Sequence, residues 1–412
     1  MPHKPQFKYF LYRSDNLIQK NSKIWAIPLP TTRKQPQKVT GISITYGDYF
    51  SAVHSFLEKN KFEILISALS KSMNRQIIPE EIEEIRVCLI KHGEFYHPSL
   101  IEAILDKHSY KFVLNVAISA TGRNCIEREY NCLKGLGNDF SFSSIPEVYG
   151  YGETRVKESG HTMSMFLGGW FEGFNEFHIS LDKTDNKHKI LVWDSEKGNY
   201  FLSPDNTLEI YRQAAIILTD YYNIETFEQI FPWHHAAGDF VIRLTSPSCP
   251  PSSRGRVWEG VKKGNSHTIE LKLITVRQYA PMFAKKEDKE TDRSVEMVLE
   301  ALLVFLLNLL IRMRLDRLNG VGDIVWSDDI AVKGALKGFF QGLRRKDSTG
   351  LSSDSFDAYF HDYLLSSCTE KDLYDLSLSI VNSYNPLAPE MPVIKDNIRK
   401  HAEVLFNAII DM

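Results

Sequence analysis

The feature that most constrains the fold is a change of pattern near residue 85. Before it, residues 49–72 carry apolar side chains at spacings of three and four, which is typical of amphipathic helices. After it come three short β-branched or aliphatic runs, residues 86–90, 100–105 and 112–119, separated by turn-rich pieces. Such runs predict strands, and the short connections favour an antiparallel meander. The sequence therefore predicts a mixed α+β fold.

A helix and two further strands are predicted directly after this meander. Residues 124–136 place apolar side chains on one helical stripe, with Asn124 as the expected N-cap and glycines as the stop signal. Short apolar runs at residues 147–151 and 162–167 then predict two more strands. The order so far is three strands, one helix and two strands.

The second half of the chain is predicted to be richer in helices. After strand character at residues 190–193 and 199–202, an amphipathic helix covers residues 208–222, with Asp205 or Asn206 as its cap. Strands are predicted at residues 240–244 and 268–279. From residue 294 to the end, the pattern is helical throughout.

The most hydrophobic run of the chain, residues 298–311, does not predict a membrane span. It contains Glu300 and Asn308 and is followed by Arg312 and Arg314. It is therefore shorter than the roughly 20 apolar residues that a spanning helix needs. We expect a buried central helix in a helical part of the protein, and no membrane as a partner.

Composition excludes several other classes. The net charge is -3, and Lys and Arg are scattered rather than clustered, so no nucleic acid or anionic membrane surface is expected as a partner. The basic first residues are not followed by an apolar core, so no signal peptide is predicted. Five cysteines without a CxxC pair fit a reducing compartment. Cytoplasm is the expected location.

The segment from Trp233 to Phe240 (WHHAAGDF) is the first choice for a functional loop. His234 or His235 would serve as general base, because histidine titrates near neutral pH. Asp239 follows three small residues and would act as a metal ligand or as an acid/base group. In the alternative interpretation, these side chains only hydrogen-bond to backbone groups of the loop beneath Trp233.

A second polar concentration lies at residues 91–98 (KHGEFYHP). His92 and Glu94 share a face of an extended segment, and His97 could approach them across a turn. Three such groups could hold a metal ion, although zinc sites usually have a fourth ligand and better-defined spacing. The alternative is an exposed hairpin with its turn at Gly93.

The order of predicted elements resembles that of the protein-kinase-like fold, in particular its aminoglycoside and choline phosphotransferase branch. Residues 124–136 correspond to the helix of the family's N-lobe. Residues 170–174 (WFEGF) resemble its hinge, and Gly238-Asp239 lies where the family has Gly-Asn at the end of its catalytic loop. The resemblance covers residues 85–340 and implies two lobes, an antiparallel-sheet N-lobe and a helical C-lobe.

The resemblance also implies a set of nucleotide-binding residues. Ser119, or Asn115 in another register, occupies the position of the family's phosphate-binding lysine. Glu129 falls where the helix glutamate would pair with that lysine. Glu172 flanks the hinge and would accept a hydrogen bond from a substrate amine, or form part of a solvated rim. Arg277, in an otherwise apolar strand, must pair or bind an anion.

The sequence departs from the family's motifs at three positions. The lysine is missing from the third strand, and Thr275 or Arg277 stands where a metal-binding aspartate is expected. With Asp239 aligned on the family's asparagine as a metal ligand, His234 occupies the catalytic aspartate position. With Asp239 as the catalytic carboxylate, the asparagine position holds Leu244. Phosphoryl transfer depends on Mg²⁺ and cationic side chains, so either register leaves the set incomplete.

These observations predict a divergent kinase-like protein, and its function has two interpretations. In one, it is an ATP- and Mg²⁺-dependent phosphotransferase acting on a small molecule; in the other, it is a nucleotide-binding pseudokinase, and whether it is an enzyme stays open. Its helical tail would offer a surface to a protein partner. The competing hypotheses are an enzyme without nucleotide, built on a His/Asp/Glu metal or acid–base site, and a module that only binds proteins.

The predicted domain organisation has four parts. Residues 1–84 form an N-terminal arm with a helical extension, and residues 85–170 form the strand-rich N-lobe. Residues 171–293 contain the hinge, a helix and the hairpin that carries the candidate loop. Residues 294–412 form the helical C-terminal part.

Overall fold

The computed structural model divides the chain into two compact units, Met1–Glu172 and Gly173–Met412. The residues that it describes are 4–12, 14, 16–20, 22–30, 44–93, 95–156, 160–194, 196–233, 238–245, 268–282, 294–347 and 356–412. Each unit has its own elements and is described by itself.

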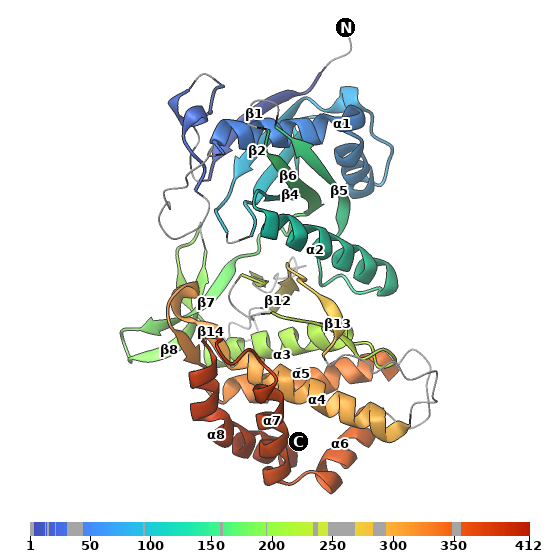
Figure 1. Cartoon of the computed structure of the whole chain (residues 1–412), viewed down its shortest axis with the longest axis vertical. Helices are drawn as coiled ribbons and strands as arrows, with labels where there is room; N and C mark the ends of the chain where they lie inside the picture. The colour runs from blue at the N-terminus through green and yellow to red at the C-terminus, as the bar shows by residue number, and fades with distance from the viewer. Residues whose placement is uncertain are drawn as a thin grey trace, which may run out of the picture. The chain divides into compact units, whose positions relative to one another are not determined.

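The first unit combines one sheet with two long helices (Figure 1). Its strands lie in the order β1-β2-β3-β4-β6-β5; β1 runs parallel to β2, and all other neighbours are antiparallel. Its elements are β1 (Gln6–Leu11), η1 (Lys23–Ala26), α1 (Tyr46–Met73), η2 (Pro79–Glu81), β2 (Glu84–Leu89), β3 (Ser99–Leu105), β4 (His108–Ala117), α2 (Ala120–Asp139), β5 (Val148–Arg155) and β6 (Thr162–Gly169).

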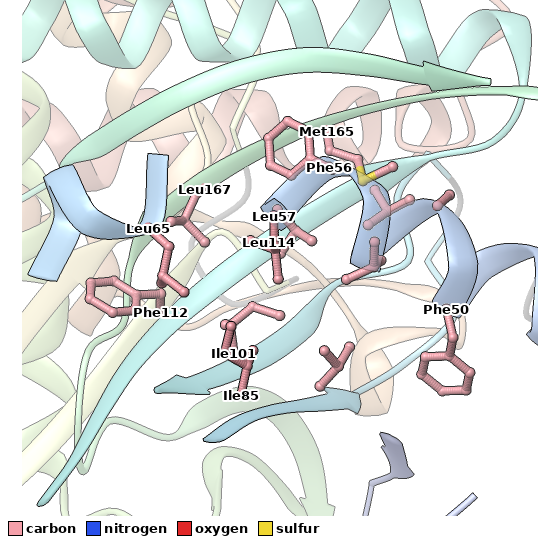
Figure 2. Packing of buried hydrophobic residues seen from close by; sticks show 14 of the residues in the cluster. Phe50, Phe56, Leu57, Leu65, Ile85, Ile101, Phe112, Leu114, Met165 and Leu167 are labelled. Atoms are coloured by element: carbon pink, nitrogen blue, oxygen red, sulfur yellow. The ribbon is translucent and has the colours of Figure 1, made fainter. Parts of the chain in front are cut away.

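The core of the first unit lies between α1 and one face of the sheet (Figure 2). Burial alternates strictly along β3, as expected for a strand that points every second side chain into a core. Phe56 of α1 and Met165 of β6 both belong to this cluster. The next residue of β6, Phe166, instead contacts Tyr130 of α2, with ring centroids 6.1 Å apart. The two helices therefore cover opposite faces of the sheet.

The second unit is dominated by helices that pack around α4 and α5 (Figure 1). Its elements are β7 (Glu176–Asp182), β8 (Lys187–Trp193), β9 (Tyr200–Phe201), α3 (Pro204–Asp220), β10 (Glu228–Ile230), β11 (Phe240–Thr245), β12 (Thr268–Leu273), β13 (Tyr279–Pro281), α4 (Val295–Met313), β14 (Leu315–Arg317), η3 (Leu318–Gly320), β15 (Ile324–Trp326), α5 (Ile330–Asp347), α6 (Phe356–Ser367), α7 (Glu370–Asn382) and α8 (Met391–Ile410). Its strands form small sheets, β7-β8-β9, β10-β13, β11-β12 and β14-β15.

Small residues allow α5 to lie directly against α3. A side chain at Gly338 would overlap the carbonyl oxygen of Arg212, and a Cβ at Gly334 would come within 2.6 Å of the carbonyl oxygen of Leu208. Glycine at these positions lets the two helix backbones approach more closely than any other residue would. Close packing of α3 fixes the helix that precedes the candidate loop.

The predicted α+β class is confirmed, with an antiparallel-rich sheet in the first unit and helices dominating the second. The predicted order of three strands, a helix and two strands is present as β2, β3, β4, α2, β5 and β6. The hydrophobic run at residues 298–311 is the core helix α4, in which residues from Leu302 to Met313 are mostly buried.

Several predicted boundaries are wrong, and capping explains two of them. Helix α2 begins at Ala120, because the Ser119 side chain accepts a hydrogen bond from the Gly122 N–H; Asn124 is not the cap. Helix α3 is likewise capped by Ser203. The strand predicted at residues 268–279 is two strands, β12 and β13, which pair with different partners. In the described part of the chain, no helix is apolar over enough residues to cross a membrane.

Candidate functional site

Asp239 is positioned by the first residue pairs of the β11-β12 hairpin. Phe240 pairs with Leu273, and one step further the carbonyl of Asp239 accepts a hydrogen bond from the Ile274 N–H at 2.7 Å. Gly238 before it has a φ of 81°, a left-handed conformation that glycine adopts without strain. The backbone of residues 238–240 is thus set by the ladder, and the direction of the Asp239 side chain follows from it.

Trp233 and the strand pair β10-β13 hold the other side of this site. Trp233 is 2% exposed and its ring meets Phe240 edge-on at 6.3 Å. Ile230 pairs with Tyr279, and the Phe231 N–H donates to the Gln278 carbonyl at 3.1 Å. Residues 274–278 therefore run between two fixed ladders, and Arg277 lies on this stretch.

Arg277 binds Asp239 through both arms of its guanidinium. Nη1 donates to Oδ2 and Nη2 donates to Oδ1, each at 2.6 Å, and Nη1 also approaches the Pro232 carbonyl at 3.3 Å. The Asp239 side chain is 1% exposed and that of Arg277 is 30% exposed. A two-pronged, charge-assisted contact of this kind is among the strongest polar interactions in proteins. It neutralises the Asp239 carboxylate inside the second unit.

The predicted roles of the two histidines stay predictions. His234 and His235 lie outside the described residues. Trp233 before them and Asp239 after them in the chain are both buried. The structure thus supplies the two ends of the WHHAAGDF segment and the partner of its carboxylate.

Three of the predicted nucleotide-binding residues belong to the first unit, where each has a structural position. Ser119 is the N-cap of α2 and accepts a hydrogen bond from Gly122. Glu129 is 1% exposed on the buried face of the same helix. Glu172 forms an ion pair with Lys111 of β4 at 2.8 Å. Their assignment to a nucleotide stays a prediction.

Lys111 is a residue that the sequence analysis did not single out. It lies on the strand where the resemblance places a lysine, but nearer the start of that strand than Ser119 or Asn115. Its side chain is 32% exposed and pairs with Glu172. The predicted third strand began at residue 112, one residue after Lys111, whereas β4 begins at His108 and includes it.

The histidine cluster at residues 91–98 brings two of its members together. Nδ1 of His92 and Nδ1 of His97 lie 3.0 Å apart, and the Tyr46 hydroxyl is 3.3 Å from Nε2 of His92. Burial and the neighbouring His92 lower the pKa of His97 to about 4, and burial also lowers the pKa of His92. Glu94 lies outside the described residues. Within the described ranges, no group of three or more His, Cys, Asp or Glu side chains could hold a metal ion.

The arrangement around Asp239 does not fit a Mg²⁺ ion. Mg²⁺ prefers carboxylate and water oxygens in octahedral geometry, and both oxygens of Asp239 are bound by Arg277. The second metal position implied by the resemblance holds Thr275 or Arg277 rather than a carboxylate. The guanidinium of Arg277 already occupies the position beside Asp239 that a metal cation would take.

Comparison with known proteins identifies no family. No protein-family model and no curated protein matches the chain. Solved structures that match include WaaP in complex with acyl carrier protein, with 10% identity over 70% of this chain and 86% of that one and a TM-score of 0.29. Another is the Drosophila melanogaster PAN3 pseudokinase, with 9% identity over 77% of this chain and 64% of that one and a TM-score of 0.25.

A third similar structure is a kinase domain, with 9% identity over 79% of this chain and 90% of that domain and a TM-score of 0.24. Two of these three proteins are thus named as a kinase or a pseudokinase, and the aminoglycoside and choline branch is not among them. At these TM-scores the similarities carry no argument about the site.

Proposed function

We propose that this chain is a kinase-like pseudoenzyme, which retains the architecture of a phosphotransferase but does not transfer a metal-bound phosphoryl group. The single observation that carries the proposal is the contact of Arg277 with both carboxylate oxygens of Asp239. Phosphoryl transfer requires Mg²⁺ to neutralise the charge that develops on the transferred group. In this chain Asp239, the candidate ligand for Mg²⁺, is already neutralised by Arg277.

The energetics support a stable rather than a transient contact of Arg277 with Asp239, which keeps a metal ion from this carboxylate. Asp239 is buried, so breaking the pair without replacing the guanidinium would take this cation away from a buried carboxylate, at a cost of about 3–5 kcal/mol. A Mg²⁺ ion would have to offset that cost and would still lack a second carboxylate, because Thr275 or Arg277 stands at that position. The chain is therefore expected to act by binding, with its helical tail as the surface for a protein partner.

Titration calorimetry with ATP tests this proposal, run once with MgCl₂ and once with EDTA. We expect the wild-type protein to bind ATP equally well, or equally weakly, under both conditions, and to release no phosphate. Asp239→Asn is expected to leave the result unchanged. Glu270→Gln, which alters an exposed carboxylate on the same hairpin, is the matched control.

One pattern would contradict the proposal. If wild-type protein and Glu270→Gln bind ATP only with Mg²⁺, and Asp239→Asn weakens that binding about tenfold or more, Asp239 must leave Arg277 and bind the metal. Arg277 would then not block a metal ion from Asp239.

A further inference from the structure

The β2-β3 connection, of which residues 90–93 and 95–98 are described, is closed by a hydrogen bond between two imidazole rings. Nδ1 of His92 and Nδ1 of His97 lie 3.0 Å apart, and the ring centroids lie 5.2 Å apart. One of these nitrogens must donate a hydrogen and the other must accept it with a lone pair. Two imidazolium rings cannot form this bond, because both Nδ1 atoms then carry a hydrogen. The bond is kept only while at least one of the two rings is neutral.

Backbone contacts with α1 and β4 hold His97 in a buried position. His97 is 2% exposed, and its N–H donates to the Val116 carbonyl at 2.8 Å. Its carbonyl accepts a hydrogen bond from the Tyr49 hydroxyl at 2.6 Å, and the same hydroxyl lies 2.8 Å from Oγ of Ser99. A second proton on the His97 ring would therefore place a charge where little water reaches it, which burial disfavours.

The groups around the two rings do not offset this effect. From α1, the Tyr46 hydroxyl lies 3.3 Å from Nε2 of His92, and Tyr49 binds the backbone of His97 rather than its ring. Burial, and then the neighbouring His92, lower the pKa of His97 to about 4, and burial also lowers the pKa of His92. In the described part of the chain, none of the groups that shift the pKa of His97 is a carboxylate.

The same connection lies against the first turn of α2. A Cβ on Gly122 would come within 2.5 Å of the Phe95 carbonyl oxygen, so this carbonyl contacts the helix where it begins. Within the connection, the Gly93 N–H donates to the Tyr96 carbonyl at 2.9 Å. The imidazole hydrogen bond therefore closes a segment that contacts the first turns of both α1 and α2, and its loss would loosen both contacts.

We propose that the His92–His97 pair is a pH-sensitive switch, in which protonation of both rings releases the β2-β3 connection from the first turns of α1 and α2. The switch is independent of the proposed pseudoenzyme character, because it belongs to the first unit and does not involve Asp239. A released His97 titrates near its ordinary pKa of about 6.5, whereas the pKa of the closed form is about 4. The released form thus binds more protons as the pH falls, and His97 alone should raise the equilibrium constant for release about twentyfold between about pH 7 and about pH 5.

Amide hydrogen exchange of the full chain at about pH 7 and about pH 5 tests the proposal. The rates are compared as protection factors, which correct for the pH dependence of intrinsic exchange. The probes are the amides of Ile90, Gly93 and His97, each of which donates a backbone hydrogen bond in or from the connection. We expect their protection factors to fall about twentyfold at the lower pH. The amides of β3, which pairs with both β2 and β4, should keep their protection.

His97→Gln removes the titrating ring but keeps a side chain that can donate to or accept from His92. Its protection factors should change less than about threefold between the two pH values. His108→Gln, at an exposed histidine between β3 and β4 whose ring contacts the Asp106 carbonyl, is the control and should behave as the wild type does. Constant protection in the wild type, or the wild-type fall in His97→Gln, would overturn the proposal. So would an equal loss of protection in β3, because acid would then unfold the sheet as a whole.

Discussion

The Asp239–Arg277 pair makes a sharp prediction about stability, because its two partners are buried to different degrees. Asp239 is 1% exposed, whereas Arg277 is 30% exposed. Arg277→Met removes the cation and leaves a carboxylate that water does not reach. Asp239→Asn removes the anion and leaves a guanidinium that water partly hydrates. The two single substitutions should therefore not cost the same.

The structure sets the expected magnitudes. Both contacts of the pair are 2.6 Å long, so Arg277→Met should lower the free energy of unfolding by about 3–5 kcal/mol, as for a buried pair that loses one member. Asp239→Asn should cost about 1.5–3 kcal/mol, the range for hydrogen bonds to charged groups. The double variant should cost about 2 kcal/mol less than the sum of the two single substitutions, because it contains neither the buried carboxylate nor the guanidinium.

Urea unfolding of the four proteins, followed by circular dichroism, measures these values as changes in midpoint at constant slope. Arg243→Met is the matched control on the same hairpin, because Arg243 and its partner Glu270 are each 39% exposed and an exposed pair contributes about 0–1 kcal/mol. The reasoning is refuted if Arg277→Met costs no more than Arg243→Met, or if the double variant costs the full sum.

Two further predictions concern packing and pH. Gly338→Ala should destabilise the second unit by about 1–3 kcal/mol, because its Cβ would overlap the Arg212 carbonyl, whereas Gly137→Ala, with nothing within 4 Å, should stabilise α2 by up to about 1 kcal/mol; thermal unfolding measures both, and equal effects would contradict the packing argument. Burial lowers the pKa of His401 to about 3, so the unfolded chain takes up a proton below about pH 6.5 that the folded chain does not. His401→Phe should therefore reduce the stability lost between about pH 7 and about pH 5 by about 2 kcal/mol, and an unchanged loss in urea unfolding at the two pH values would contradict it.

The elements of this fold follow from local patterns, which is why the sequence predicted them. The alternation that marks residues 100–105 is the same alternation that buries every second side chain of β3. The stripe on residues 124–136 places Leu133 and Leu136 on the buried face of α2. Helix ends were harder, because several polar residues compete near each start: Ser119, not Asn124, caps α2.

The ion pair of Arg312 with Glu390 could not be predicted, because its members come from distant parts of the second unit. Arg312 lies in the last turn of α4, Asp316 lies on β14, and Glu390 precedes α8. In sequence, Arg312 and Asp316 flank the end of a hydrophobic run and look like its solvated border. Only the folded chain brings Glu390 within 3.1 Å of Arg312 and buries Arg312 and Asp316.

The candidate loop could be predicted from the sequence only in part. Sequence singled out Asp239 as a carboxylate that would bind a metal or a proton, and Arg277 as a cation that must pair or bind an anion. Whether they meet depends on the register of the β11-β12 hairpin, and the segment 246–267 between its strands is far longer than the two-residue turns that set a hairpin register. Pairing of Phe240 with Leu273 brings Arg277 back onto Asp239. Each residue thus supplies the opposite charge that the other requires in the second unit.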